Sequence, residues 1–436
     1  MSQSSPTPPE RKLKITILTA GSRGDVQPYC ALGIGLKRAG HEVTVAANEN
    51  FSSFVRQFDL EFALIAGNMQ EFLQSKKGMR LIAGEKTKLE DEEKLLRQQL
   101  QSAWAGCQGA EVIIYTPLTT FGYHIAEKLG VPCFMASVVP LTPTGMFGFL
   151  RFARTTTNPL KKVINYASYF VAEFLYWQRY RKLLNEFRTK TLKLPPLPYF
   201  GSRFRPKTPA NVERIPVLYG FSSHVIPKPR DWPAWAYVTG FWFIDRADEY
   251  EPPMELEDFL GKKVPPLCFG FGSMTMPNPE YLTYYIVEAL KKTRQGGIIL
   301  SGWGQVGNIV NIKDSLRVFV IKDVPHDWLL PQVPAMVHHG GAGTTAAVLR
   351  AGIPSIVVPF FAPQPVWGQK LAQLGVNPAP IPYKEVSEKT LAAAIEVVLG
   401  DEAMLQKAQD LGQKIRGEDG VANAVEAFHR HLGLMG

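Results

Sequence analysis

The feature that most constrains this chain is a glycine-rich turn between two apolar segments, within AMVHHGGAGTTAAVLRAGIPSIVVPFFAPQPVWGQ (residues 335–369). Periodicity and glycine punctuation predict a buried strand over 335–339, a turn over 340–343, a helix over 344–350 and a second parallel strand over 355–361. Three glycines in four positions let the backbone approach a ligand closely, and the N-terminus of the next helix presents unpaired N–H groups and a positive dipole end. The turn therefore favours an anion, and we expect a diphosphate.

Two side chains beside this turn suit such a ligand. His339 precedes the glycines and is able to donate a charge-assisted hydrogen bond to a phosphate, and Thr344 adds a hydroxyl at the helix start. The alternative is a tight turn with a core histidine, because glycine turns are common in α/β domains that bind nothing.

The first βαβ unit repeats this arrangement near the amino terminus. An apolar strand is predicted over 14–20, a turn over 21–28 with Pro28 at the first helical position, a helix that stops at Gly40, and a strand over 41–47. The glycines of the turn, Gly21 and Gly24, lack the G-x-G-x-x-G spacing of a dinucleotide site, and so does the Gly270-x-Gly272 pair. A nicotinamide-dependent oxidoreductase is therefore disfavoured.

Asp25 is the residue of the turn over 21–28 whose side chain is suited to proton transfer. A carboxylate presented at a strand-to-helix turn is able to accept a proton from an incoming hydroxyl. Capping of the following helix is the alternative role, which Asp commonly fills.

The string VHHGGAGTT followed by PFFAPQPVWG resembles the donor-binding signature of family 1 GT-B glycosyltransferases, specifically the sterol glucosyltransferase-like branch, which also includes glycopeptide-antibiotic glycosyltransferases. The resemblance extends from about Lys14 to Leu432 and includes GSRGDVQP and GFGSM. It implies that Asp25 is the general base. It also implies donor binding by a larger set: Ser22, Arg23, Gly24, Ser273, Trp303, Val324, His339, Gly341, Ala342, Gly343, Thr344 and Gln364.

The chain departs from this family at one position of the signature. The usual ending is Asp-Gln-Pro, whose Asp and Gln bind hydroxyls of the donor sugar, whereas this chain has Pro363-Gln364-Pro365. The glutamine is kept and the carboxylate is missing. An alternative to an active hexosyltransferase is therefore a nucleotide-sugar-binding protein with lost or altered donor use. Trp303 and Trp328 follow strands in loops that frame the nucleotide base in the family, and core packing is their other possible role.

Charge is concentrated in one segment. The net charge is +9, and residues 151–207 hold 13 Lys and Arg against two acids, which gives +11 there and −2 elsewhere. Aromatic residues alternate with Arg179, Arg181, Lys182 and Arg188 in this segment, which favours docking on an anionic membrane surface over a merely solvated face. No nucleic-acid-binding module accompanies the charge.

The remaining composition fits a reduced compartment. The four cysteines have no C-x-x-C spacing, and the polar, proline-rich lead over residues 1–12 is not a signal peptide. The sequence thus predicts a cytoplasmic protein, monomeric and peripheral at the membrane, that uses no metal and no cofactor beyond a nucleotide-sugar co-substrate.

The resemblance implies an α/β chain of GT-B fold, with two doubly wound Rossmann-like domains facing across a cleft. We expect an acceptor-binding domain over 13–226, a linker over 227–260, a nucleotide-sugar domain over 261–415 and a C-terminal helix over 416–436 that crosses back to the first domain. The implied activity is inverting, metal-independent transfer of a hexose from a UDP-glucose-like donor to a lipid-like alcohol such as a sterol or another terpenoid. The alternative is a nucleotide-sugar-binding protein with lost or altered donor use.

Overall fold

The computed structural model describes residues 11–68, 71, 75, 89–201, 215–274, 279–303, 306–307 and 317–434. The described residues form two compact units. Unit 1 comprises those from 11 to 68, 89 to 244 and 419 to 434, and unit 2 comprises those from 245 to 418 with Glu71 and Ser75. The boundary after Ile244 falls inside the predicted linker, and nearly all of the predicted lead lies outside the described residues.

Unit 1 is built on a parallel sheet that, in the described part of the chain, has seven strands in the order β3-β2-β1-β4-β5-β6-β7. The strands are β1 (Lys14–Leu18), β2 (Glu42–Asn48), β3 (Glu61–Ile65), β4 (Val112–Tyr115), β5 (Cys133–Ser137), β6 (Val217–Tyr219) and β7 (Ala236–Val238). The central strands read as continuous apolar runs because helices cover both faces of a parallel sheet. Strand order changes direction between β1 and β4.

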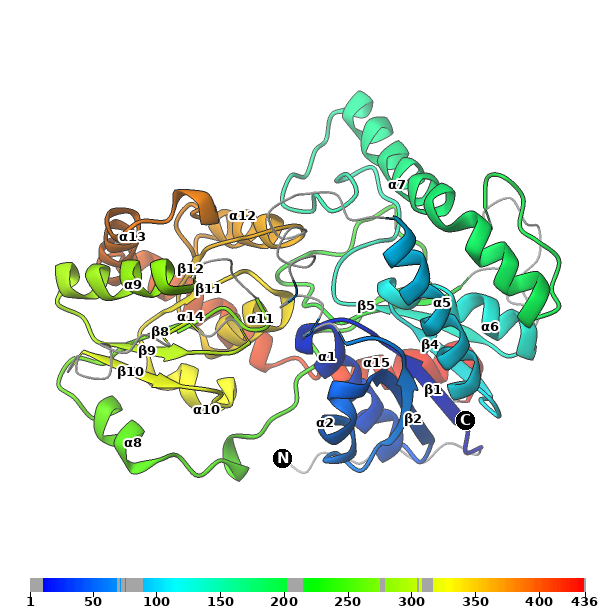
Figure 1. Ribbon diagram of the computed structural model, residues 1–436. Coiled ribbons are helices and arrows are strands. Elements are labelled where there is room, and N and C mark those ends of the chain that lie inside the picture. Colours follow the sequence, from blue (N-terminus) through cyan, green and yellow to red (C-terminus); the bar gives the residue numbers. More distant parts are fainter. Residues whose placement is uncertain are drawn as a thin grey trace. The chain divides into compact units, whose positions relative to one another are not determined.

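The helices of unit 1 include one from the far end of the chain (Figure 1). They are α1 (Arg23–Arg38), α2 (Ser52–Arg56), α5 (Leu89–Gly106), α6 (Gly122–Leu129), α7 (Pro159–Glu186) and α15 (Gly420–Leu432). The C-terminal helix α15 packs against α1 and β6. Gly35 of α1 makes this close packing possible, because a Cβ there would lie 2.3 Å from Cγ1 of Val421.

Unit 2 is a smaller parallel sheet with strand order β10-β9-β8-β11-β12 among the described residues. Its strands are β8 (Leu267–Gly270), β9 (Gly297–Leu300), β10 (Val318–Ile321), β11 (Met336–His338) and β12 (Ser355–Val357). Its helices are α8 (Met254–Leu260), α9 (Pro279–Thr293), α10 (His326–Leu329), α11 (Ala342–Ala351), α12 (Gln364–Leu374), α13 (Glu388–Gly400) and α14 (Glu402–Arg416). The prediction of two doubly wound α/β domains is confirmed.

The predicted start of the first helix is wrong. Helix α1 begins at Arg23, and Pro28 lies inside it rather than at its first position. The reason is a capping box, in which Ser22 and Asp25 satisfy the exposed donors of the first turn and start the helix five residues earlier.

The basic segment folds as helix α7, which the Asn158 side chain caps by accepting a hydrogen bond from Lys161 N at 3.1 Å. Its C-terminal end continues as a π-helical segment (Phe187–Thr191). Arg188 is fully buried there: its guanidinium pairs with both carboxylate oxygens of Glu127 and lies 3.0 Å from Nδ1 of His124. The prediction that Arg188 belongs to a membrane-facing set is therefore wrong, because its charge is used inside the unit.

The length and polarity of the helices bear on membrane insertion. Searching the described residues finds no helix with the length and apolar character needed to cross a bilayer. Residues 202–207 of the basic segment lie outside the described part of the chain.

Candidate functional site

Both sheets place their chemistry-bearing loops at the point where strand order reverses. In open parallel α/β sheets, ligands bind at the carboxyl ends of the strands at this switch point. In unit 1 it lies between β1 and β4, and the turn that carries Asp25 follows β1. In unit 2 it lies between β8 and β11, where His338 pairs in register with Gly270. The predicted loops around Ser273 and His339 are thus brought side by side.

The imidazole of His339 lies between two glycine backbones. A Cβ on Gly341 would be 2.3 Å from Nε2 of His339, and a Cβ on Gly272 would be 3.0 Å from its Cε1. Gly272 also has a φ of +58°, which favours glycine. Both glycines are therefore required for this imidazole to occupy its position.

The same imidazole has unused hydrogen-bonding capacity. His339 is buried, and its Nδ1 has no hydrogen-bond partner within the described residues. Burial lowers its pKa to about 4; the nearby Gly270 carbonyl acts in the opposite direction, and His326 lowers it further. The free protein thus holds a neutral imidazole at pH 7, and a bound anion would raise its pKa.

The N-terminus of α11 supplies backbone donors next to His339. Thr345 N bonds to Gly341 O at 2.8 Å, so the N–H groups of Ala342, Gly343 and Thr344 precede the first intrahelical bond. The N-cap residue, Gly341, has no side chain to satisfy them. These donors, with the helix dipole, form a site suited to a phosphate group.

Gly343 has no steric reason to be glycine. A Cβ there would meet nothing within 4 Å, its φ lies outside the left-handed region, and alanine is the better residue in a helix. An open space above the first turn of α11 is the space that a ligand bound to these N–H groups would need.

The loop after β9 closes on the same turn. Trp303 N donates to Gly272 O at 3.3 Å, and a Cβ on Gly302 would lie 2.3 Å from that oxygen. Trp303 is half-buried beside this contact. Val324 follows β10, but its side chain is buried in the core, so only its backbone is available to a nucleotide. Trp328 is half-buried and packs on Tyr250 with ring centroids 5.1 Å apart.

Gln364 opens helix α12 and turns its amide inward. Its Oε1 accepts from Phe360 N at 2.8 Å, and its Nε2 lies 3.2 Å from the sulfur of Met274. Pro363 is the N-cap residue of the same helix and is half-buried. A sugar hydroxyl bound by Gln364 would share the amide with these internal contacts, because the Nε2 group has a second N–H.

In unit 1, the carboxylate of Asp25 divides its two oxygens between different environments. Oδ2 accepts from Ser22 N at 2.8 Å and from Ser22 Oγ at 2.9 Å, which is the capping box. Oδ1 accepts no hydrogen bond from the described residues. The capping role is thus observed, and it uses only Oδ2, so the hydrogen-bonding capacity of Oδ1 is not used by the described residues.

Neighbouring groups set the position and the pKa of Asp25. Although part of the residue is exposed, burial of its carboxyl raises the pKa, while the Ser22 hydrogen bonds lower it. A Cβ on Gly21 would lie 2.5 Å from Oδ2, and Gly21 N is held by Oδ1 of the buried Asn48 at 3.0 Å. Asn48, at the end of β2, thus fixes the turn against which the carboxylate packs.

The other predicted donor residues of unit 1 occupy the same turn. Ser22 is the N-cap residue of α1, and Gly24 is exposed. Arg23 donates to Oε1 of Gln27 at 3.1 Å and stacks on the Phe54 ring at 5.3 Å from its centroid.

Sequence reasoning did not assign two residues that shape these sites. Gly272 belongs to the GFGSM string and to a pair that lacks dinucleotide spacing, but neither assigns it a role; the signal that it packs against His339 is its position after a strand that neighbours β11. Asn48 carried no sequence signal, because its bond to Gly21 spans 27 residues. In the described part of the chain, no group of three or more His, Cys, Asp or Glu side chains is arranged to hold a metal ion.

Comparison with known proteins agrees with the two-unit organisation. The model of the Glycosyltransferase family 28 N-terminal domain matches residues 15–147, and that of the Erythromycin biosynthesis protein CIII-like C-terminal domain matches residues 295–426. A sterol 3-beta-glucosyltransferase of Arabidopsis thaliana is 37% identical over 438 residues, covering 97% of this chain and 68% of the relative. A second one from that plant is 37% identical over 437 residues, covering 96% and 66%.

A solved structure shares the fold. The glycotransferase of kitacinnamycin aligns with 96% of this chain and 99% of its own, with a TM-score of 0.67 and 17% sequence identity.

Proposed function

Because the chain belongs to the sterol 3-beta-glucosyltransferase-like branch of the GT-B glycosyltransferases, we propose that it transfers a hexose from a UDP-glucose-like donor to the hydroxyl of a sterol or another terpenoid lipid. Its similarity to these relatives shows that it is a glycosyltransferase. The donor, the acceptor and the mechanism are the proposed part.

The structural observation that best supports the proposal is the position of His339 next to the N-terminus of α11, whose N-cap residue has no side chain. His339 directly precedes the glycine turn and has a buried ring nitrogen, Nδ1, without a partner among the described residues. Its Nε2 lies against Gly341, the N-cap residue whose helix begins with three N–H groups that no described group accepts, and Gly343 leaves open space beside them. This arrangement suits the leaving diphosphate of a nucleotide sugar, whose charge increases as the glycosidic bond breaks.

In unit 2, the proposed role of these donors is to stabilise the departing diphosphate. His339 would donate to a phosphate oxygen, and the helix dipole would add its positive end. The transfer would need no metal, because these groups neutralise the leaving group. Ser273 and Thr344 would add hydroxyl contacts, and Trp303 would contact the base.

In unit 1, the proposed general base is Asp25. Its Oδ1 would take the proton of the acceptor hydroxyl while Oδ2 remains in the capping box. Direct attack of the activated oxygen on the anomeric carbon would invert its configuration. A raised pKa makes the carboxylate a stronger base than an exposed Asp, since the proton is held more tightly.

Because the proposed acceptor is lipid-like, the enzyme would act at a membrane surface. We include an anionic lipid surface among the partners, in agreement with the local excess of positive charge over residues 151–207.

A direct assay tests the proposal. Purified protein is incubated with labelled UDP-glucose and a panel of sterols and other terpenoid alcohols, with and without EDTA, and the anomeric configuration of any product is read by NMR. We expect a sterol β-glucoside that forms equally well with EDTA present. Binding of the nucleotide sugar without any product would favour the alternative of a binding protein.

A further inference from the structure

Helix α7 has an apolar face that no part of the described chain covers. Leu160, Ile164, Ala167, Val171 and Leu175, here called the α7 stripe, are spaced by four, three, four and four residues, so they lie on one side of the helix. The four large members are exposed to between 56% and 70%, and Ala167 is exposed as well. Soluble monomers rarely expose apolar side chains in such a continuous row, and a row of this kind marks an interaction surface.

Other sides of the same helix are tied to unit 1. Asn165 donates to Gly145 O at 3.0 Å, Ser168 accepts from Phe149 N at 2.8 Å, and the Tyr169 hydroxyl donates to Phe147 O at 3.2 Å. These contacts fix the rotation of the helix about its axis. The α7 stripe faces away from the unit for this reason, and not because the helix is loosely packed.

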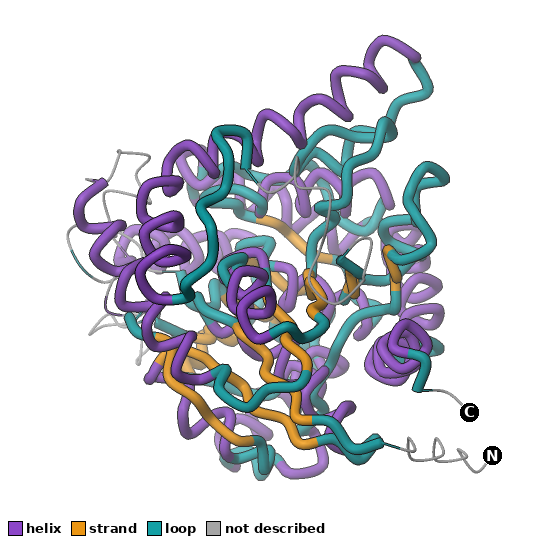
Figure 2. Tube along the Cα trace, turned by 90° about the vertical axis from the view of Figure 1, so that its right-hand side faces the viewer, coloured by secondary structure: helices purple, strands orange, loops and turns teal. Residues whose placement is uncertain are grey.

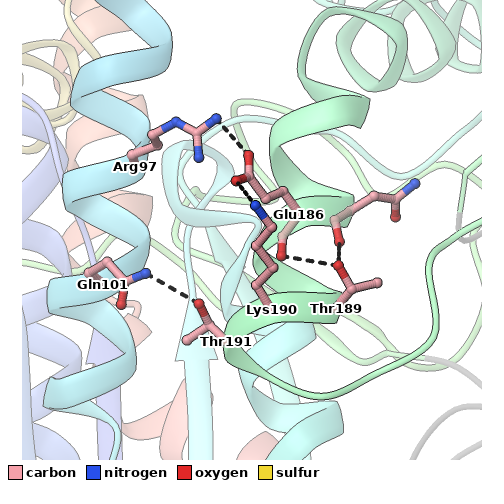
Figure 3. Close-up of polar contacts among 7 residues, drawn as sticks. Arg97, Gln101, Glu186, Thr189, Lys190 and Thr191 are labelled. Atoms are coloured by element: carbon pink, nitrogen blue, oxygen red, sulfur yellow. Dashed lines mark hydrogen bonds and ion pairs between the residues drawn. The ribbon is translucent and has the colours of Figure 1, made fainter.

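The C-terminal end of α7 is also anchored (Figure 3). Glu186 pairs with Arg97 of α5 at 2.6 Å and with Lys190 at 2.9 Å, and Gln101 of α5 donates to Thr191 at 3.2 Å. Figures 1 and 2 show α7 as a long helix along the edge of unit 1, with its N-terminal end reaching beyond the neighbouring helices. The stripe is thus held on a fixed, protruding support.

Cations flank the α7 stripe at both ends. Arg154 and Lys161 are exposed near its start, and Lys182, on the side of the stripe, is exposed two turns beyond its end. Between Arg151 and Asn185 the sole acid is Glu173, which lies on another side of the helix from the stripe. Apolar side chains between basic ones match the layering of an anionic bilayer surface, where acyl chains lie below negative headgroups.

We propose that the α7 stripe docks this protein on an anionic lipid surface, with the helix lying in the headgroup layer and its flanking lysines on the phosphates. The stripe covers about 23 Å of helix, which is shorter than the roughly 30 Å hydrocarbon core of a bilayer, and polar residues such as Lys161 and Asn165 stand beside it on the same helix. The helix therefore lies on the membrane and does not span it. The inference deepens the proposed function and rests on it for its purpose, which is access to a lipid-like acceptor; the binding itself does not depend on catalysis.

Sedimentation with vesicles tests the docking surface. Wild-type protein is mixed, without donor or acceptor, with phosphatidylcholine vesicles that do or do not contain phosphatidylserine. The stripe variant is L160S/I164S/V171S/L175S. The matched control is Y281S/Y284S/V397S/L405S, which removes four exposed apolar residues of unit 2. Circular dichroism and thermal unfolding check that each variant folds.

We expect wild type and control to sediment with the anionic vesicles, and the stripe variant to partition at least about tenfold less, since binding scales with buried apolar area. Salt, or the charge variant K161Q/K182Q, should also weaken sedimentation, because salt screens the attraction to the headgroups and that attraction is proportional to charge. Equal sedimentation of the stripe variant and wild type would overturn the proposal, and so would a wild type that stays in solution.

Two further results separate the possible occupants and functions. If wild type self-associates without lipid, the stripe variant does not, and neither binds vesicles, the stripe is an interface between copies and the proposal is wrong. Glucosylation of a detergent-dispersed sterol by a wild type that ignores vesicles would overturn the docking alone. Vesicle binding through the stripe without any sugar transfer would uphold the docking and reject the proposed function.

Discussion

The side chains of His41 and His429, which are 388 positions apart in the chain, share a buried hydrogen bond with Nε2 2.8 Å from Nε2. His41 lies just before β2 and His429 lies in α15, so this bond joins the C-terminal helix to the sheet of unit 1. Leu13 N donates to Nδ1 of His41 at 3.3 Å, which requires that nitrogen to be unprotonated. Nε2 of His41 is therefore the donor, and a proton added to either ring would break a hydrogen bond.

This pair predicts that unit 1 loses stability in mild acid. Burial, and then the neighbouring His429, lower the pKa of His41 to about 4, and burial lowers the pKa of His429. The contribution of His41 is fully present above the unfolded pKa of about 6.5 and is lost as pH falls toward 4, which amounts to about 3 kcal/mol. Hydrogen exchange of α15 amides between pH 4 and 8 measures this loss. His429→Gln, which keeps an acceptor for His41 but does not titrate, should reduce the slope; an unchanged slope would contradict the assignment.

The substitution Asp25→Asn distinguishes the role of Asp25 as general base from its role in capping helix α1. Asparagine is able to accept the hydrogen bond from Ser22 N, so the helix start and the melting temperature should change little, whereas the turnover rate should fall at least about a hundredfold. In the wild type, activity should decline as pH falls through the raised pKa of Asp25, because the protonated carboxyl cannot accept another proton. A near-normal rate in steady-state assays would leave Asp25 with the capping role alone.

The two glycines at the start of α11 should respond differently to alanine. Gly341→Ala places a methyl 2.3 Å from Nε2 of His339, so it should displace the imidazole and destabilise unit 2. Gly343→Ala meets no atom and should raise stability by a few tenths to about 1 kcal/mol, yet weaken diphosphate binding because its methyl enters the ligand's space. Thermal unfolding with UDP calorimetry checks both. Unaltered UDP affinity in Gly343→Ala would show that no ligand uses this helix start.

Removal of His339 should weaken binding of a nucleoside diphosphate. His339→Ala is expected to cost about 1.5–3 kcal/mol of affinity, the range for a hydrogen bond to a charged group. His338→Ala is the matched control: His338 is also buried, but its Nδ1 accepts from Gly340 N, and burial holds its pKa well below the usual range. Isothermal calorimetry in buffers of different ionisation enthalpy would also reveal proton uptake by His339 on binding. Identical affinities of wild type and His339→Ala would remove this residue from the donor site.

Pro363 should weaken the enzyme's discrimination between donor sugars of different configuration. The proline side chain has no acceptor and Pro363 has no N–H, whereas the resembled signature has an Asp here that is expected to bind sugar hydroxyls. The amide of Gln364 also makes internal contacts. We expect weak discrimination between gluco- and galacto-configured donors, or a preference for a deoxy sugar. Pro363→Asp should raise turnover with UDP-glucose, and Asp is also a favourable N-cap for α12. A wild type that is already fast and strictly gluco-selective would show that another residue supplies the contact.

Much of the fold was accessible from local patterns. The strand predicted over 335–339 and the helix predicted over 344–350 appear as β11 and α11, and the strands predicted over 14–20 and 41–47 appear as β1 and β2. Such elements depend on side-chain periodicity and turn residues within a few positions, which a single sequence displays. The start of α1 was mispredicted because Pro28 was given more weight than the capping box of Ser22 and Asp25.

The amino-acid sequence by itself determined the chemistry that this protein has to use: the glycines around His339, the carboxylate in the first turn, the proline at 363 and the concentration of positive charge over residues 151–207. Only the tertiary structure decided which of these groups are available. It buried Arg188 against Glu127, turned the amide of Gln364 inward, placed Gly272 against His339 and joined His41 to His429. These outcomes depend on contacts between residues far apart in the chain, and burial, not sequence position, sets whether a charge meets water, a partner or a ligand.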